Sequence, residues 1–190
     1  FVDVSQSAGV NGNKVFGGTI FIDYNNDGYE DIFACSACDV PMYCSGGGPD
    51  DINMLFENNG DGTFIDRTFN SGILDNYKSY GVARGDVNND GFDDIYIVNE
   101  TQLSQLYLNN TNDNQMLKIS LKGTYSNRDG IGSKIVVYSD DLYQQKAVRS
   151  GSSMSSQNSF DIIFGISDNE IIDSLIIYWP SRMIDKYYEV

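Results

Sequence analysis

The 190-residue chain contains no histidine. Histidine is the commonest general base, it completes the Ser-His and Cys-His nucleophile systems, and it is the usual ligand of catalytic zinc. The familiar hydrolytic mechanisms and catalytic zinc sites are therefore not expected in this sequence.

Basic residues are also scarce. Twelve Lys and Arg stand against 27 Asp and Glu, which gives a net charge of −15. Nucleic-acid binding needs clustered Lys and Arg, so nucleic acid is not an expected partner. No run of about 18 apolar residues is present, so no membrane insertion is expected either. The chain is nevertheless 41% hydrophobic and 13% aromatic, which is typical of a folded protein.

The charge is unevenly distributed along the chain. Residues 1–113 carry 18 acids and 4 bases, whereas residues 114–190 carry 9 acids and 8 bases. Such asymmetry indicates two units with different roles, divided near residue 113. The sequence begins at Phe1, without a Met or a signal-like segment. We therefore expect either processing at this end or a piece of a longer protein.

Two nine-residue stretches in the acidic part share one pattern, residues 23–31 (loop 1) and 86–94 (loop 2). Each has an oxygen-bearing side chain at positions 1, 3, 5 and 9 and a Gly at position 6. Calcium takes six to eight oxygen ligands, and the Gly permits the sharp turn that brings them together. The pattern predicts two Ca²⁺ sites. The expected ligands are Asp23, Asn25, Asp27, the Tyr29 carbonyl and Asp31 in loop 1, and Asp86, Asn88, Asp90, the Phe92 carbonyl and Asp94 in loop 2.

The loops differ from an EF-hand, because position 12 holds Ala34 or Ile97 instead of Glu and the flanking segments read as strands. The acids at position 8, Glu30 and Asp93, are expected to point outward. Three carboxylates that converge on one point repel each other without a cation, so we expect each loop to loosen when calcium is absent.

The two loops belong to an internal repeat. An offset of 63 residues aligns Phe1 with Phe64 and loop 1 with loop 2, and an offset of 51 aligns the strand at Leu55 with that at Leu106. The units are about 1–63 and 64–113, and the first carries an insertion at about 35–49. Short β-branched and aromatic runs, bounded by Gly and Asn, predict strands in each unit.

This pattern resembles the FG-GAP or VCBS repeat. The resemblance covers residues 1 to about 110 and rests on Phe1–Val4, Ala8–Val10, the loops, and Leu55 to Phe64 with its turn Asn58–Gly62. It implies β-propeller blades with a calcium loop between the first two strands. Closed propellers have roughly four to eight blades, so two blades form only a partial propeller. Further repeats or partner chains are then expected.

Residues 114–190 read as a small antiparallel β domain, with expected strands at 117–121, 134–138, 160–164 and 174–179. This part resembles the ASPIC/UnbV domain, which follows propeller repeats in the cartilage acidic protein family. The resemblance rests on Asn127–Gly132, Arg149–Gln157, Phe164–Gly165 and Trp179–Ser181. Ile166–Ser167 and Arg182 depart from the family pattern. The resemblance implies an all-β, secreted or surface protein with calcium-binding repeats and no established reaction.

The remaining candidate sites lie outside the loops. Cys35, Cys38 and Cys44 are disulfide candidates in an oxidising compartment, with one thiol left over for another chain or for missing sequence. Asn99 and Asn109 begin N-glycosylation sequons. The serine-rich run 150–156 has no His and no Ser-x-x-Lys arrangement, so it reads as a solvated loop.

The sequence therefore predicts an extracellular, calcium-stabilised structural or adhesion module without catalysis, secreted or on the cell surface. Exposed strand edges predict association with other chains, as an oligomer or as the subunit of a filament. The alternative is a carbohydrate-active or carbohydrate-binding calcium propeller, similar to a polysaccharide lyase, with glycans as its partners. Such an enzyme needs a base beside the ion, and Arg84 and Tyr80 are the nearest candidates in the sequence.

Overall fold

The computed structural model describes residues 1–11, 16–37, 52–74, 77–100, 102–140 and 142–190. This part of the chain is all-β, with no α-helix and a single three-residue 3₁₀-helix (η1, Thr68–Asn70). Its strands form several antiparallel sheets, and none of the sheets closes on itself. In the described part, no helix has the length and apolar character needed to cross a membrane.

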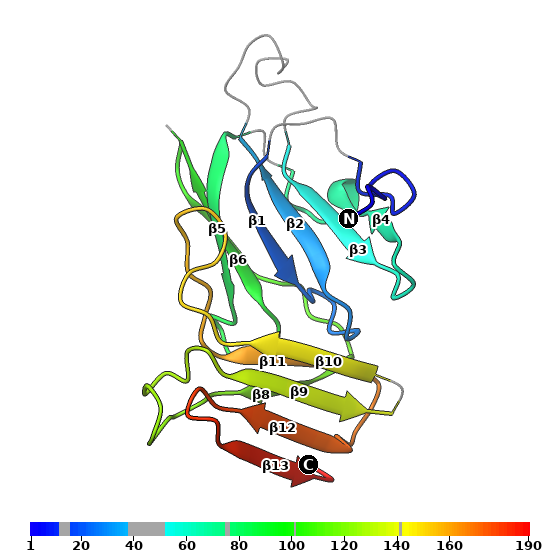
Figure 1. Cartoon of the computed structure of the whole chain (residues 1–190). Helices are drawn as coiled ribbons and strands as arrows, with labels where there is room; N and C mark the ends of the chain where they lie inside the picture. The colour runs from blue at the N-terminus through cyan, green and yellow to red at the C-terminus, as the bar shows by residue number, and fades with distance from the viewer. Residues whose placement is uncertain (12–15, 38–51, 75–76, 101, 141) are drawn as a thin grey trace.

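The acidic part folds into two sheets that stand side by side, in a partial β-propeller arrangement (Figure 1). The first sheet, blade 1, has the strand order β1 (Phe16–Ile22), β2 (Asp31–Ser36), β3 (Met54–Asn58), β4 (Phe64–Asp66). The second sheet, blade 2, has the order β5 (Ser79–Gly85), β6 (Asp94–Asn99), β7 (Gln105–Tyr107).

The strand registers of the two blades follow the sequence repeat. In each blade, one residue of the second strand pairs with a residue of the first strand and with a residue of the third strand. The resulting three-residue sets of the two blades are related by the offsets of 63 (first and second strands) and 51 (third strand). These sets are Ile20, Phe33 and Leu55 in blade 1 and Ala83, Tyr96 and Leu106 in blade 2. The repeat is therefore a structural repeat, with corresponding side chains on corresponding faces.

One face of each blade is buried against the other, and this contact forms the core of the propeller part. Blade 1 contributes Ile20, Ile22, Phe33, Cys35 and Leu55, whereas blade 2 contributes Val82, Ile95 and Ile97. Buried and exposed residues alternate along β1 and β6, which places these side chains on one face of each strand. In the described part of the chain, no third blade packs against the opposite faces.

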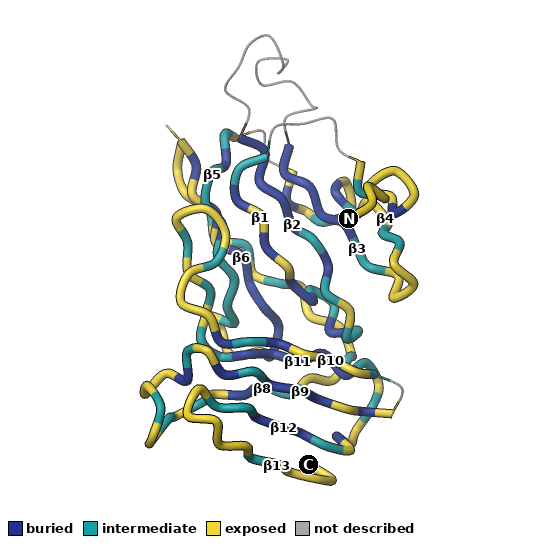
Figure 2. Tube along the Cα trace, viewed as in Figure 1, coloured by how far each residue is buried: buried dark blue, intermediate teal, exposed yellow. Residues whose placement is uncertain are grey.

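The C-terminal part is a two-layer sandwich (Figure 1). Its larger sheet has the order β10 (Leu142–Ala147), β9 (Lys134–Ser139), β12 (Ser174–Tyr178), β13 (Ile184–Tyr188). The smaller sheet pairs β11 (Ile162–Ser167) with β8 (Gln115–Ile119). Apolar residues from both sheets form its core, including Ile119, Val137, Phe164 and Ile177. Figure 2 shows these buried positions lying between exposed turns.

The strands expected from the sequence are present, with ends that differ by up to three residues. The sequence pattern does not predict β10 and β13, and it predicts a single small sheet where the structure has two packed sheets. Both strands contain consecutive polar residues, Gln144–Lys146 in β10 and Asp185–Lys186 in β13, and show no apolar alternation. Their β character comes from pairing with β9 and β12 rather than from composition.

Candidate calcium loops at the junction of the two units

Both loops lie at the blade ends that face the C-terminal sandwich. Loop 1 connects β1 to β2, and loop 2 connects β5 to β6 (Figure 1). Their backbones match: position 4 has a positive φ of 55° at Asn26 and 60° at Asn89, and the glycine at position 6 has 92° at Gly28 and 91° at Gly91. Asn and Gly adopt this left-handed conformation more readily than other residues, which explains their place in the pattern.

The carboxylate at position 1 holds each loop in its turn. Asp23 accepts hydrogen bonds from the backbone N–H groups of Asp27 (3.0 Å) and Gly28 (3.1 Å). Asp86 accepts the equivalent bonds in loop 2, both of 3.1 Å. The carboxylate at position 9 closes the loop, since Asp31 accepts from the N–H of Tyr24 at 3.1 Å. The repeated polar residues therefore shape the loops whether or not an ion is present.

Two acids of loop 1, Asp23 and Asp31, are buried away from water. Burial, with the nearby Asp27 carboxylate adding to it, raises the pKa of Asp23 to about 7 although Lys146 and backbone N–H groups oppose the change. Burial likewise raises the pKa of Asp31 to about 8, against hydrogen bonds from the N–H groups of Asn58 and Tyr24. The pKa of Asp27 is also raised, chiefly by burial. The loop thus concentrates carboxylates whose charge is poorly compensated by the protein.

The chemistry of this donor set fits a hard cation, because both loops offer carboxylate, carboxamide and carbonyl oxygens. In the described part of the chain, however, no three Asp, Glu, His or Cys side chains are gathered as a preformed metal site. The aspartates at positions 1 and 9 instead point oxygens at backbone N–H groups. The residues expected to bind calcium therefore lie together in the two loops, and calcium binding stays a prediction.

Loop 1 is held from outside by the C-terminal half of the chain. Its carbonyl oxygens at positions 2 to 4 all accept hydrogen bonds from distant residues. The donors are Nδ2 of Asn109 at position 2 (2.7 Å), Nδ2 of Asn112 (2.7 Å) and Asn114 (2.9 Å) at position 3, and the N–H of Ser167 at position 4 (3.0 Å). The linker between the units and the end of β11 thus fix the path of this loop.

Two glycines permit the close packing at this junction. A Cβ on Gly28 would stand 3.0 Å from Cδ1 of Leu142 in β10. A Cβ on Gly165, in β11, would collide with the Asp23 carboxylate and the Asn26 backbone. Loop 1 is therefore part of the interface between the two units.

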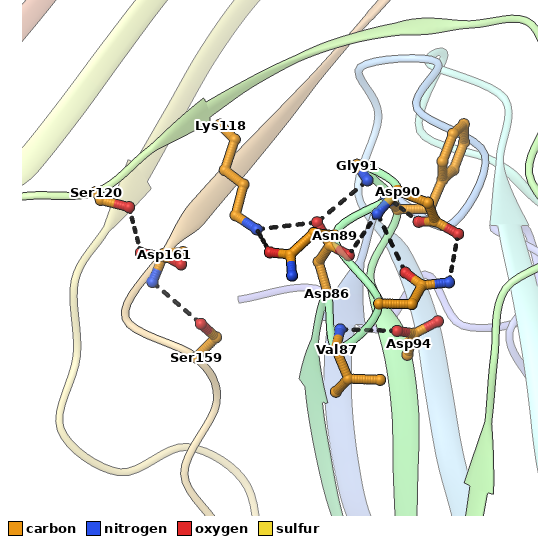
Figure 3. A network of polar contacts seen from close by, with 12 residues as sticks. Asp86, Val87, Asn89, Asp90, Gly91, Asp94, Lys118, Ser120, Ser159 and Asp161 are labelled. Atoms are coloured by element: carbon orange, nitrogen blue, oxygen red, sulfur yellow. Dashed lines mark hydrogen bonds and ion pairs between the residues drawn. The ribbon is translucent and has the colours of Figure 1, made fainter.

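Loop 2 contacts the sandwich through a lysine (Figure 3). Nζ of Lys118, on β8, lies 2.9 Å from Oδ2 of Asp86 and 3.3 Å from Oδ1 of Asn89. The Asp86 side chain is only 2% exposed. Burial alone would raise its pKa, but the hydrogen bonds from Lys118, Gly91 and Asp90 together hold the pKa below the ordinary value. An ammonium group thus compensates the first carboxylate of loop 2. Among the described residues no lysine donates to the first carboxylate of loop 1, although the charge of Lys146 acts on it from a distance.

Two models of known families match separate parts of the chain. Residues 23–97 match the model of the FG-GAP-like repeat, and residues 123–190 match that of the ASPIC and UnbV domain. The chain joins an FG-GAP-like repeat region to an ASPIC/UnbV domain. The first match begins at position 1 of loop 1 and ends within β6, so it spans both loops. The two matches fall on either side of the boundary expected near residue 113.

The chain is also similar to Cartilage acidic protein 1 of Homo sapiens. It is 40% identical over 79 residues, which make up 40% of this chain and 11% of that protein. The matched stretch therefore spans about a tenth of the relative's length. The function of the whole relative is therefore not assigned to this chain.

The acids at position 8 of the FG-GAP-like loops do not both point outward, so that expectation was wrong. Asp93 is 5% exposed and forms an ion pair with Arg84 of β5. Glu30 is partly exposed and forms a 3.1 Å ion pair with Lys146 of the ASPIC/UnbV domain. Lys146 is itself buried and also donates to the carbonyl oxygen of Ile163. Partners brought close by folding, rather than loop position, decide where these acids point.

The serine-rich run of the ASPIC/UnbV domain is not simply a solvated loop. Most of residues 150–156 are exposed, but Ser156 donates its hydroxyl to the carbonyl of Val82, and Ser159 donates its N–H to the carbonyl of Arg84. Asn158 accepts a hydrogen bond from the N–H of Arg84. This segment therefore covers the edge of β5, which would otherwise be unpaired.

The other candidate residues stay predictions. Cys35 is buried in β2, and Cys38 and Cys44 lie outside the described residues, so the structure does not address their pairing. Asn99 is 8% exposed, with Nδ2 donating to Leu103 and Gln105. Nδ2 of Asn109 is bonded to loop 1. In this fold, glycosylation at either site would require those hydrogen bonds to break.

Proposed function

We propose that the chain is an extracellular, calcium-stabilised structural or adhesion module that works without catalysis and within a larger assembly. The matches to FG-GAP-like repeats and to an ASPIC/UnbV domain support a structural module of the extracellular type. The observation that carries the proposal is that the surface buried between the two blades has an exposed counterpart on blade 2.

This counterpart follows from the repeat. Phe33, Cys35 and Leu55 of blade 1 are at most 4% exposed because blade 2 covers them. Their equivalents on blade 2, related by the offsets of 63 and 51, are Tyr96, Val98 and Leu106, which are 46%, 46% and 51% exposed. We call these three residues the open face. A repeat unit that buries this surface in one copy and exposes it in the next is ready for a further blade.

Part of the same side of blade 2 is covered by the serine-rich segment. A Cβ on Gly85 would lie 3.1 Å from Cβ of Ser159, and one on Gly81 would lie 3.5 Å from the carbonyl oxygen of Met154. In blade 1 the equivalent Gly18 faces both β5 of blade 2 and the hydroxyl group of Ser153. The serine-rich segment of the ASPIC/UnbV domain thus lies against β5, where the first strand of a neighbouring blade would pack. It leaves the open face of blade 2 uncovered. A partner blade, from another copy or from further repeats, would meet the open face.

Calcium would stabilise the junction between the two units. Asp23 and Asp31 of loop 1 are buried and carry raised pKa values, so a bound dication would offset their mutual repulsion. The residues that would hold it are those assigned from the sequence. Because loop 1 is bonded to the linker and to β11, an ion bound there would also favour one orientation of the two units.

Thermal unfolding with and without calcium tests this role. At a free calcium concentration 100 times the dissociation constant, binding at one loop adds about 2.7 kcal/mol. For a chain of this size, that corresponds to a rise in melting temperature of roughly 5–10 °C above the value in chelator. The double variant Asp23→Asn/Asp86→Asn should lose most of this rise. A melting temperature that is the same in calcium and in chelator would refute calcium stabilisation.

The contacts of Arg84 support a non-catalytic role. An enzyme that abstracts a proton beside a bound ion needs a base at that place. Arg84 is ion-paired with Asp93, and a guanidinium group stays protonated in proteins, so it cannot supply the base. A screen for cleavage of acidic polysaccharides, with and without calcium, should therefore detect no products.

A further inference from the structure

A cavity of about 350 Å³ lies where both blades meet the ASPIC/UnbV domain. Its walls come from β1, β5, β10 and the segment that follows β10, so it exists only in the assembled chain. Its volume is within the range of small-molecule sites. We call it the junction cavity.

The junction cavity gathers positive charge in a strongly acidic chain. Arg84, Lys146 and Arg149 line it, and Glu30 is the one carboxylate among the lining residues. Glu30 pairs with Lys146, and Asp93 behind the wall pairs with Arg84. Arg149 is exposed and takes part in none of the ion pairs found among the described residues. The cavity thus keeps about one uncompensated positive charge, which suits a single carboxylate better than a polyanion.

The rest of the lining suits a hydroxyl-rich ring. Ser152 and Ser153 bring hydroxyl groups, and Asn158 brings a carboxamide. Phe21, which is 57% exposed, offers an aromatic face at the cavity wall. Hydroxyl groups both donate and accept hydrogen bonds, and aromatic faces pack well against the apolar C–H side of a sugar ring.

We propose that the junction cavity binds an acidic saccharide, with the sugar carboxylate at Arg149 and the ring against Phe21. This binding goes beyond the structural role and does not depend on calcium in the loops. An acidic peptide would satisfy Arg149 equally well, but it would leave the serine hydroxyls and the Phe21 face without matching groups. The lining therefore favours a uronate.

Titration calorimetry of the whole chain with trigalacturonate tests the proposal. We expect saturable binding, and little binding of the fully methyl-esterified trisaccharide, which has the same size without the charge. Arg149→Ala should weaken binding about tenfold or more, because it removes a charge-assisted hydrogen bond. Phe21→Ala should also weaken it. Arg128→Ala is the matched control, since Arg128 is exposed and does not line the cavity, and it should bind as the unchanged chain does.

Amide chemical shifts from nuclear magnetic resonance locate the site without relying on the stability of a variant. Shifts at Phe21 and at residues 151–153 on addition of trigalacturonate would support the proposal. Absence of binding, equal binding of the methyl ester, or unchanged binding by Arg149→Ala and Phe21→Ala would overturn it. Tighter binding of triglutamate or of inorganic sulfate would also overturn it, since the site would then recognise an acidic peptide or a simple anion. Calcium binding is measured separately by thermal unfolding, so either proposal can fail alone.

Discussion

The first aspartates of the two loops show how one residue type acquires different properties. Asp23 and Asp86 accept equivalent backbone hydrogen bonds, yet burial raises the pKa of Asp23 to about 7 whereas the pKa of Asp86 is below its ordinary value. The difference has two causes: burial acts more strongly on the Asp23 carboxylate, and Lys118 donates a hydrogen bond to Asp86 at 2.9 Å. In the absence of an ion, loop 1 carries the larger electrostatic cost.

Stability in calcium-free buffer should therefore depend on pH through loop 1. Asp23 and Asp31 have folded-state pKa values of about 7 and 8, above the ordinary value of 3.8. Their contribution is fully present below the unfolded pKa and is lost as the pH rises through the folded pKa. We expect the melting temperature in chelator to fall between about pH 5 and pH 8. Differential scanning calorimetry across this range measures the effect.

The matched control for this dependence is the same position in loop 2. Asp23→Asn should flatten the decline because the amide does not ionise, whereas Asp86→Asn should leave it in place because the pKa of Asp86 is not raised. Excess calcium should remove the decline in the unchanged chain, since the ion binds the deprotonated form. A melting temperature that rises steadily from pH 5 to pH 8 in chelator would contradict the expectation.

At the scale of single residues, spacing predicts which side chains shape a loop but not what they meet. The oxygens at positions 1 and 9 and the glycine at position 6 could be read directly, because their roles are local. The burial of Asp93 beside Arg84 could not, and neither could the pairing of Lys118 with Asp86. These partners come from other strands, and a sequence without its fold does not bring them together.

At the scale of elements, β8 controls loop 2 through Lys118. The ammonium group occupies one oxygen of the first proposed ligand, so a bound calcium ion would be repelled by it or would displace it. Lys118→Met keeps most of the side-chain length and removes the charge. We expect it to raise the calcium affinity of loop 2 at least severalfold, as measured by titration calorimetry.

A neighbouring lysine gives the control for this change. Lys122→Met alters an exposed lysine in the segment after β8, which forms no hydrogen bond or ion pair with loop 2 in the described part of the chain. It should leave both affinities unchanged. Loop 1 serves as an internal reference, since Lys118 does not contact it. In chelator, Lys118→Met should lower the melting temperature because Asp86 keeps its burial and loses its partner. Equal loop 2 affinities before and after the change would show that the lysine does not oppose calcium.

Whether a strand could be predicted from the sequence depended on its own amino-acid composition. Strands with β-branched or aromatic residues, such as β1, β6 and β9, could be recognised from the sequence. β10 could not, because it is rich in Gln and Lys and is paired on β9. Its Lys146 and Gln144 nevertheless face the loop 1 junction, where they donate to carbonyls of β11. A strand that supplies polar side chains to an interface is therefore hard to recognise from its sequence.

At the scale of the whole molecule, the chain is an open structure with one side capped. The repeat offset, the two units and the partial propeller followed from the sequence, since they depend on patterns within each segment. The packing of residues 153–159 against β5 did not, because the run has no apolar periodicity and is placed by backbone hydrogen bonds. This cap leaves the open face of blade 2 as the surface for further blades.

Association through the open face is the last prediction. The unchanged chain should form larger particles as its concentration rises in millimolar calcium, because burying Tyr96, Val98 and Leu106 removes apolar area from water. Tyr96→Lys/Leu106→Lys should abolish this growth without unfolding, since both side chains are about half exposed in the single chain. Tyr125→Lys is the control, since it places the same charge at a residue 84% exposed on the other unit. Multi-angle light scattering measures the mass, and a monomeric unchanged chain, or growth that survives the double variant, would show that the open face is not the contact.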